Sequence, residues 1–185
     1  MRWLAPALFV MLLSGSAAAD EAEPWCAPEL ETLADDVCYH EQADEEGQPS
    51  TLVVFLHGLV KEGAGWQHNQ MRGAVRGGKR LGFSVIAPRG RVGAHKSEGM
   101  VAWPTSAKAQ ETFEAALLAE WRKARTSIEA RRGAPFEQIY VVGFSNGAYY
   151  ASSLALRGTF AADGFAVFAG ATSWRPASIA PPEER

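Results

Sequence analysis

Hydrophobic residues gather in four short runs, each of which has the length of a β-strand. The runs are apolar at nearly every position, which is typical of strands in a parallel sheet that is covered on both faces. Polar or glycine-containing positions separate the runs from their neighbours, as expected where the chain turns. The four predicted strands are residues 51–56, 83–88, 139–142 and 164–170.

Segments with helical periodicity alternate with these strands. The clearest is 110–131, while 65–80 has a weaker pattern diluted by glycines and 148–156 directly follows the third strand. The stripe on 110–131 that predicts burial consists of Phe113, Leu117, Trp121, Ala124 and Ile128. Alternation of strand and helix implies right-handed crossovers, and therefore an α/β fold with a parallel sheet and helices on both faces.

The remaining segments are predicted to be peripheral. Before the first strand we expect a short helix at 29–34 and a brief strand at 37–39, and 89–105 reads as a long loop, a type of segment that is often functional. The chain then divides into an acidic N-terminal segment, 20–50, one α/β core, 51–175, and an unstructured proline-rich tail, 176–185.

The first 19 residues have the pattern of a signal peptide. Arg2 precedes an apolar stretch from Leu4 to Leu13, and three alanines, Ala17 to Ala19, form a small-residue cleavage site. An uncleaved membrane anchor is the alternative, but the apolar stretch is shorter than the roughly 20 residues that cross a bilayer. The pattern predicts a periplasmic or secreted protein without a stable membrane anchor.

Composition and charge narrow the class of protein. A chain of 185 residues that is 47% hydrophobic and 21% charged suits one globular domain. Removal of Arg2 with the signal peptide changes the formal net charge from −3 to −4, which argues against a nucleic-acid partner. Residues 20–60 contain no Lys or Arg, so we expect an acidic segment that lies on a more basic body.

Cys26 and Cys38 are the only cysteines, and both belong to the predicted exported segment. An oxidising compartment would join them in a disulfide. A metal site is the weaker interpretation, because two thiols and the nearby His40 leave a fourth ligand missing. We therefore expect a disulfide, no metal and no cofactor.

A serine flanked by glycines stands between the third strand and the helix after it. Gly143-Phe144-Ser145-Asn146-Gly147 matches the G-x-S-x-G nucleophile elbow. In such a turn the serine backbone is strained, and the flanking glycines avoid contacts that a Cβ would not permit. The helix N-terminus beyond it stabilises developing negative charge. Ser145 is therefore the candidate nucleophile; the alternative is a glycine-rich turn without a chemical role.

Together these residues resemble the α/β-hydrolase superfamily, and within it the small serine esterases of the phospholipase/carboxylesterase type. They are also similar to secreted polyester depolymerases and feruloyl esterases. The resemblance extends from residue 52 to residue 170 and includes His57-Gly58-Leu59 at the end of the first strand. It implies a three-layer fold, here incomplete at the C-terminal edge of the sheet, that hydrolyses carboxylic esters through an acyl-enzyme. It further implies Ser145 as nucleophile, with the backbone N–H groups of Leu59 and Asn146 as the oxyanion hole.

The same superfamily places an acid and then a histidine after the serine. No histidine follows Ser145, and the only later acids are Asp163, Glu183 and Glu184. Asp163 precedes the fourth strand, so we expect it at the opposite end of the sheet from Ser145. Glu183 and Glu184 belong to the tail, which has no packing pattern.

An earlier histidine is one possible source of the general base. His57, beside the oxyanion turn, and His95, on the long loop, are the candidates, although histidines of this kind more often have structural roles or are merely exposed. The simpler interpretation is that these residues are the N-terminal portion of a serine hydrolase. A downstream-encoded C-terminal segment would then be a partner that supplies the acid and the base.

Two functions follow from the sequence. The first is an exported serine esterase, acting on a small or polymeric ester, with Trp66 and Trp103 as candidates for an acyl pocket or for the core. The second is a non-catalytic protein that keeps a hydrolase-like fold for binding, or an inactive fragment. The fold alone does not choose between ester substrates.

Overall fold

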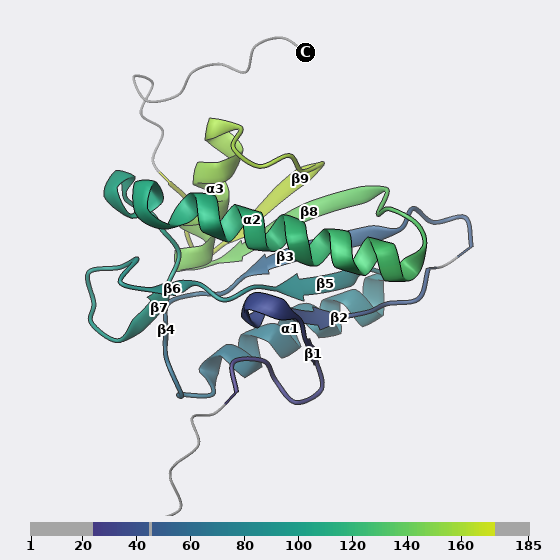
Figure 1. The fold of residues 1–185 in the computed structure, drawn as a ribbon, viewed down its shortest axis with the longest axis horizontal. Helices are drawn as coiled ribbons and strands as arrows, with labels where there is room; N and C mark the ends of the chain where they lie inside the picture. Colours follow the sequence, from purple (N-terminus) through teal and green to yellow (C-terminus); the bar gives the residue numbers. More distant parts are fainter. Residues whose placement is uncertain (1–23, 45, 173–185) are drawn as a thin grey trace, which may run out of the picture.

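The computed structural model describes residues 24–44 and 46–172, which form a mixed α/β fold (Figure 1). Six strands make one sheet in the order β1-β2-β5-β3-β8-β9. Their bounds are β1 Glu31–Thr32, β2 Cys38–His40, β3 Thr51–Leu56, β5 Ser84–Ala87, β8 Gln138–Phe144 and β9 Gly164–Phe168. The pairs β3–β5, β3–β8 and β8–β9 are parallel, and β1 and β2 join antiparallel. The four predicted strands and the mostly parallel sheet are confirmed.

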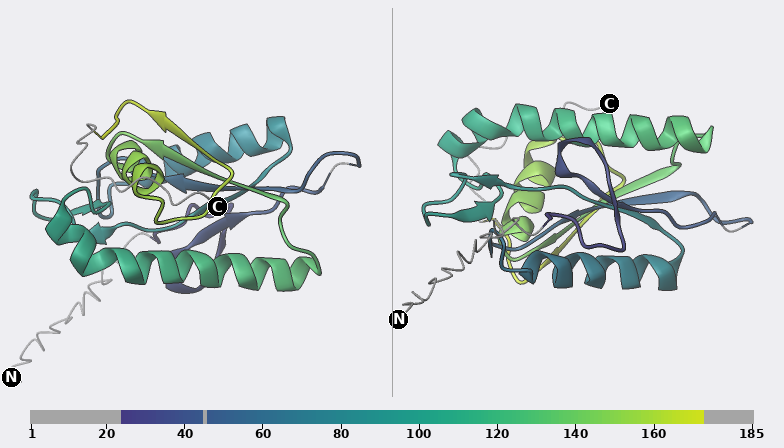
Figure 2. Two further views of the ribbon diagram at one scale, coloured as in Figure 1. Left: turned by 90° about the horizontal axis from the view of Figure 1, so that it is seen from above. Right: turned by 60° about the horizontal axis from the view of Figure 1, so that its bottom comes forward.

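Three helices pack on this sheet: α1 Trp66–Leu81, α2 Ala107–Arg132 and α3 Asn146–Arg157. Side chains of β3 point alternately to the two faces, because successive residues of a strand alternate. Leu52 and Val54 belong to a core with α2 and α3, whereas Phe55 belongs to a second core with Met71 and Val75 of α1. Figure 2 (right) shows α1 and α2 on opposite sides of the sheet.

The strand before Ser145 is buried on only one face. Ile139, Val141 and Gly143 of β8 are buried, but Tyr140 and Val142 are partly exposed. The expectation of burial on both faces is therefore wrong for β8, because α1 packs mainly against β5 and leaves the same face of β8 open. Sequence pattern could not reveal this, since the residues on the open face are as apolar as those on the closed one.

The N-terminal segment adds strands to the sheet instead of the helix predicted at 29–34. Glu31 and Thr32 pair antiparallel with Tyr39 and Cys38, and a 3₁₀ turn at Ala34–Asp36 connects the two strands. A helix of six residues is too short to be stable by itself, so this segment forms a strand that pairs with β2 instead.

Charge complementarity holds this acidic segment on the body, as the sequence predicts. Five ion pairs connect it to basic residues of the rest of the chain. They are Glu29–Arg72, Asp35–Lys123, Asp36–Arg89, Glu31–Arg131 and Asp44–Arg132. Exposed pairs of this kind contribute only a little stability each, so their main effect is on where the segment docks.

The segment 89–105 is more regular than the predicted long loop. β6 Arg91–Val92 and β7 Met100–Ala102 form a small antiparallel sheet with β4 Val60–Lys61. Each strand is only two or three residues long, and β4 is distant in sequence from its partner β7, which explains why no local pattern reveals the sheet. The small sheet lies beyond the carboxyl end of β3 (Figure 1).

The predicted disulfide between Cys26 and Cys38 is present, and both residues are buried. We expect its reduction to lower the free energy of unfolding by about 3 kcal/mol, since an open loop of this size gains entropy in the unfolded chain. Urea unfolding with and without reductant measures the change. The double variant Cys26→Ala/Cys38→Ala should not respond to reductant, and coincident curves for the wild-type chain would contradict the prediction.

Some expectations lie outside the described residues: the signal peptide at 1–19, the tail at 176–185, and Glu183 and Glu184 within it. Among the residues that the structure describes, no helix has the length and apolar character needed to cross a bilayer.

Candidate active site

Ser145 occupies a strained corner between β8 and α3. Its φ is 51° and its ψ is −114°, a backbone conformation that a residue with a side chain rarely adopts. The Ser145 N–H donates to the carbonyl of Phe168 on β9, and its carbonyl accepts from the N–H of Ala148. The strand–turn–helix context expected for a nucleophile elbow is therefore present.

Both flanking glycines are required by the packing of this corner. A Cβ on Gly143 would lie 2.3 Å from the carbonyl oxygen of Gly147. A Cβ on Gly147 would lie 2.1 Å from the carbonyl oxygen of Leu56, at the end of β3. These neighbours are backbone atoms that cannot move aside, so α3 can begin this close to β3 and β8 only with glycine at both positions.

The turn after β3 lies directly beside Ser145. A Cβ on Gly58 would be only 3.3 Å from the Cβ of Ser145. The Gly58 N–H donates to Oε1 of Gln70 on α1 at 2.6 Å, whereas the N–H groups of Leu59 and Asn146 have no acceptor among the described residues. Two unoccupied N–H groups next to a serine are what an oxyanion hole needs.

A cavity of about 420 Å³ opens in front of Ser145. Its lining brings together four sequence-predicted residues: Ser145, Leu59, Asn146 and His95. The rest of the lining is Thr105, Tyr149 and Thr172. Sequence reasoning missed Tyr149, although its spacing of four residues from Ser145 places it on the same face of α3.

The structure assigns His57 a structural role. Its Nδ1–H donates to the Gly58 carbonyl at 2.6 Å, and its Nε2 accepts from the Gly90 N–H at 3.1 Å. The ring is buried between Trp25 and Trp103, and this burial lowers the pKa of His57 to about 4 despite the bond to Gly58. With both nitrogens occupied, His57 has no free lone pair to accept a proton from Ser145. The interpretation of His57 as substitute base does not fit this geometry.

His95 lines the Ser145 cavity, but its hydrogen bonding is unsuited to a general base. Its Nδ1 accepts from the Ser97 N–H at 3.1 Å. In the neutral ring the proton is then on Nε2, which makes that nitrogen a donor. His95 would have to give up the bond to Ser97 before Nε2 could accept a proton.

The acid of a triad is also absent from the described lining of this cavity. Asp163 lies at the other end of β8, as the sequence predicts: its Oδ2 accepts from the Ile139 N–H at 2.7 Å. Ile139 and Ser145 are six residue steps apart along an extended strand, a distance of about 20 Å. Asp163 therefore fixes the start of β8 and does not act at Ser145.

Neither tryptophan that was a candidate for an acyl pocket lines this cavity. Trp103 is fully buried, and it donates from Nε1 to the His57 carbonyl at 2.8 Å and from its backbone N–H to Oδ1 of Asn146 at 2.7 Å. It therefore ties the turn after β3 to the start of α3. Trp66 is 53% exposed and lines a different groove, beside α1.

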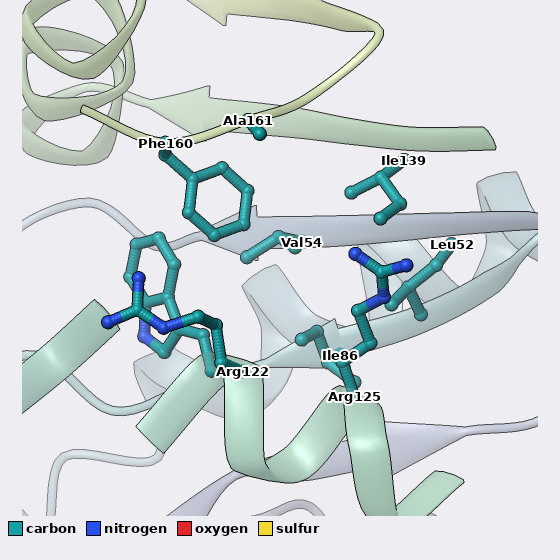
Figure 3. Close-up of a pocket in the computed structure, with 9 residues that line it drawn as sticks. Leu52, Val54, Ile86, Arg122, Arg125, Ile139, Phe160 and Ala161 are labelled. Carbon is teal, nitrogen blue, oxygen red and sulfur yellow. The ribbon is translucent and has the colours of Figure 1, made fainter. Parts of the chain in front are cut away.

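A smaller pocket of about 120 Å³ lies between α2 and the sheet (Figure 3). Arg122 and Arg125 extend from α2 toward the apolar side chains of Val54 and Phe160. This pocket contains no nucleophile and shares no lining residue with the Ser145 cavity, so it is separate from the candidate active site.

No protein-family model matches the chain, and no curated protein matches it either. Among the described residues, no group of three or more His, Cys, Asp or Glu side chains is placed to hold a metal ion. The site is therefore defined by its own geometry: a strained serine at a strand–helix corner, two free N–H groups and an open cavity.

Proposed function

We propose that this protein is an exported serine hydrolase of carboxylic esters, of the α/β-hydrolase type, with Ser145 as nucleophile. The observation that carries the proposal is the strained backbone of Ser145, whose φ is positive, in a corner that is tight enough to require glycine at positions 143 and 147. Such strain persists only where the surrounding structure imposes it, and it clusters at functional sites. The sheet with α1 on one side and α2 and α3 on the other fits the three-layer arrangement of that superfamily.

In the proposed reaction, Oγ of Ser145 attacks the ester carbonyl carbon and the hydroxyl proton passes to a base. The carbonyl oxygen becomes an oxyanion that accepts hydrogen bonds from the N–H groups of Leu59 and Asn146. Collapse of this intermediate, with transfer of the proton from the base to the leaving oxygen, releases the alcohol and leaves an acyl-enzyme. Water then hydrolyses the acyl-enzyme to the carboxylic acid and restores the Ser145 hydroxyl. The cavity of about 420 Å³ has room for a small acyl or alcohol group beside Tyr149.

The base is the component that the described residues do not provide in a competent arrangement. We infer that it comes from polypeptide beyond them, in keeping with a C-terminal segment encoded downstream. Without it Ser145 is a weak nucleophile, so the chain alone should turn over esters slowly. The disulfide fits the oxidising compartment that export implies.

Labelling with a fluorophosphonate probe tests the proposal directly. The probe phosphonylates an activated serine and releases fluoride, so we expect slow labelling of the wild-type chain and none of Ser145→Ala. Ser127→Ala is the matched control, since Ser127 is an exposed serine on α2 far along the chain from the site. Equal labelling of Ser145→Ala and wild type would refute Ser145 as the nucleophile.

The second candidate is a non-catalytic binding protein with a hydrolase-like fold. One observation favours it: the hydrogen bond from the Ser97 N–H to Nδ1 of His95 keeps the proton of the neutral ring on Nε2, so that nitrogen cannot act as a base toward Ser145. Turnover of p-nitrophenyl acetate distinguishes the two: a rate that falls in Ser145→Ala supports the hydrolase, and a complete lack of both turnover and labelling supports the binding protein.

A further inference from the structure

An apolar groove of about 1040 Å³ lies beside α1, on the face of the sheet opposite α2. Its floor is made by residues of β3, β8 and β9 on this face of the sheet, including Val53, Val142 and Ala166. Two large side chains at its edges are mostly in solvent: Trp66 is 53% exposed and Phe168 is 57% exposed. Exposed apolar surface of this extent marks an interaction site, and the groove is at the upper limit of small-ligand pockets.

The wall formed by α1 contains Gly73 and Gly77, and no contact within the described residues requires glycine at either position. Gly78 has an internal reason, because its Cβ would lie 2.5 Å from the Phe83 carbonyl oxygen. Gly73 and Gly77 line the groove, and a Cβ there would meet only side-chain atoms, at 3.8 Å and 3.4 Å. Glycine is a poor helix former, so an exposed glycine inside a helix needs another explanation.

The spacing of Gly73 and Gly77 supplies that explanation. Residues four apart lie one above the other on the same face of a helix, so these two positions leave a shallow notch along α1. Small residues in such a notch let a second helix approach closely, with its ridges of side chains in the groove. The apolar floor and the notch together fit a helix that packs beside α1.

Charge indicates the chemistry of this second helix. α1 carries four basic residues, Arg72, Arg76, Lys79 and Arg80, and no acid. Arg76 lines the groove and has no ion-pair partner among the described residues. A helix with carboxylates beside its apolar face complements Arg76, whereas α1 of a second copy would bring more positive charge.

The strand next to the groove is open as well. Within the described part of the chain β9 pairs with β8 alone, so its other edge has backbone groups available for a further strand. A polypeptide that adds a strand to β9 could therefore continue directly into the groove.

We propose that the groove binds an amphipathic helix of a partner polypeptide, with an apolar face against β8 and β9 and acidic side chains facing Arg76. The proposal concerns the sheet face opposite α2 and does not depend on the chemistry of Ser145.

The test uses the mature chain from Asp20 and two synthetic helical peptides of 16 residues. Both have leucine and alanine on one face; one has glutamate and the other lysine at the remaining positions. Trp66 reports binding, because its fluorescence should shift to shorter wavelength when the groove is filled. We expect the glutamate peptide to bind at least tenfold more tightly than the lysine peptide.

Two variants make the result specific. Gly73→Leu should fold with an unchanged or higher urea midpoint, since its Cβ has room, but should bind the glutamate peptide at least tenfold more weakly because the leucine fills the notch. Arg76→Glu should reverse the preference between the peptides. Truncation after Thr172 should leave binding unchanged; tighter peptide binding after truncation would identify residues 173–185 as a competing occupant.

Other outcomes would overturn the proposal. Equal binding of both peptides to wild type and Gly73→Leu would show non-specific adhesion to apolar surface. Binding to anionic phospholipid vesicles without peptide discrimination would identify a membrane surface instead, and a stable dimer that Gly73→Leu dissociates would identify a second copy as the occupant. Fluorophosphonate labelling of Ser145, measured in parallel, separates failure of this proposal from failure of the proposed hydrolase.

Discussion

Gly147→Ala is expected to destabilise the protein by at least about 3 kcal/mol and to leave little folded chain. The added Cβ would lie 2.1 Å from the Leu56 carbonyl oxygen and 2.7 Å from that of His57. Both contacts are with the backbone of the central strand and its exit turn, so α3 would have to move away from β3. Overpacking usually costs about 1–3 kcal/mol where neighbouring side chains can move aside. Here the neighbours are backbone atoms, so the cost should be on the order of the largest single-mutation effects. Urea unfolding followed by circular dichroism measures the loss.

Gly73→Ala is the matched control for this prediction. Gly73 is also a glycine at a helical position, but its Cβ would meet only the end of the Arg76 side chain, at 3.8 Å. Replacement should raise the free energy of unfolding by up to about 1 kcal/mol, because alanine is the better helix former. If Gly147→Ala unfolds at the same urea concentration as wild type, then the close approach of α3 to β3 is wrong.

Acid is expected to destabilise the protein through His57. The pKa of the buried ring is lowered to about 4, whereas in the unfolded chain it returns to about 6.5. Between these values the unfolded state binds the extra proton, so stability rises with pH across this range. The contribution of His57 is complete above pH 6.5 and is lost as the pH falls toward 4. The shift corresponds to about 3 kcal/mol of unfolding free energy.

The variant His57→Gln tests this assignment, because glutamine keeps hydrogen-bonding groups but does not titrate. Its absolute stability will fall, since the buried contacts of His57 with Gly58 and Gly90 change. The informative quantity is the slope of unfolding free energy against pH between 6.5 and 4, measured by urea titration at each pH. That slope should be shallower in His57→Gln than in wild type, because the variant lacks the one proton that His57 takes up on unfolding in this pH range. An equal slope would show that His57 is not buried as a neutral ring.

Gly147 and the His57 ring both contact the backbone at the end of β3 and in the turn that follows it. Gly147 packs on the carbonyls of Leu56 and His57, and the His57 ring holds the turn that carries Leu59. Loss of either contact should displace the N–H groups of Leu59 and Asn146 relative to Ser145. Variants that remain folded should therefore label more slowly with fluorophosphonate, although Ser145 itself is unchanged.

The sequence by itself determined the elements that local pattern specifies. The apolar run at 51–56 and the stripe on 110–131 are confirmed as β3 and α2, because a buried strand or helix face requires apolar residues at regular positions. The run at 164–170 is confirmed as the strand β9, although none of its residues is buried. The glycines around Ser145 were also predictable, since a strained turn between strand and helix has few sequence solutions. The disulfide followed from two cysteines and a predicted route of export.

Tertiary structure alone decided which of these residues meet. It joined β4, β6 and β7 into a sheet from pieces too short to have a pattern, and it turned 29–34 into a strand and a 3₁₀ turn because pairing with β2 outweighs a short helix. It also separated two histidines that looked alike in the sequence. His57 has both nitrogens bonded in a buried site and His95 lines the Ser145 cavity, because burial and hydrogen-bond partners depend on segments far away in the chain.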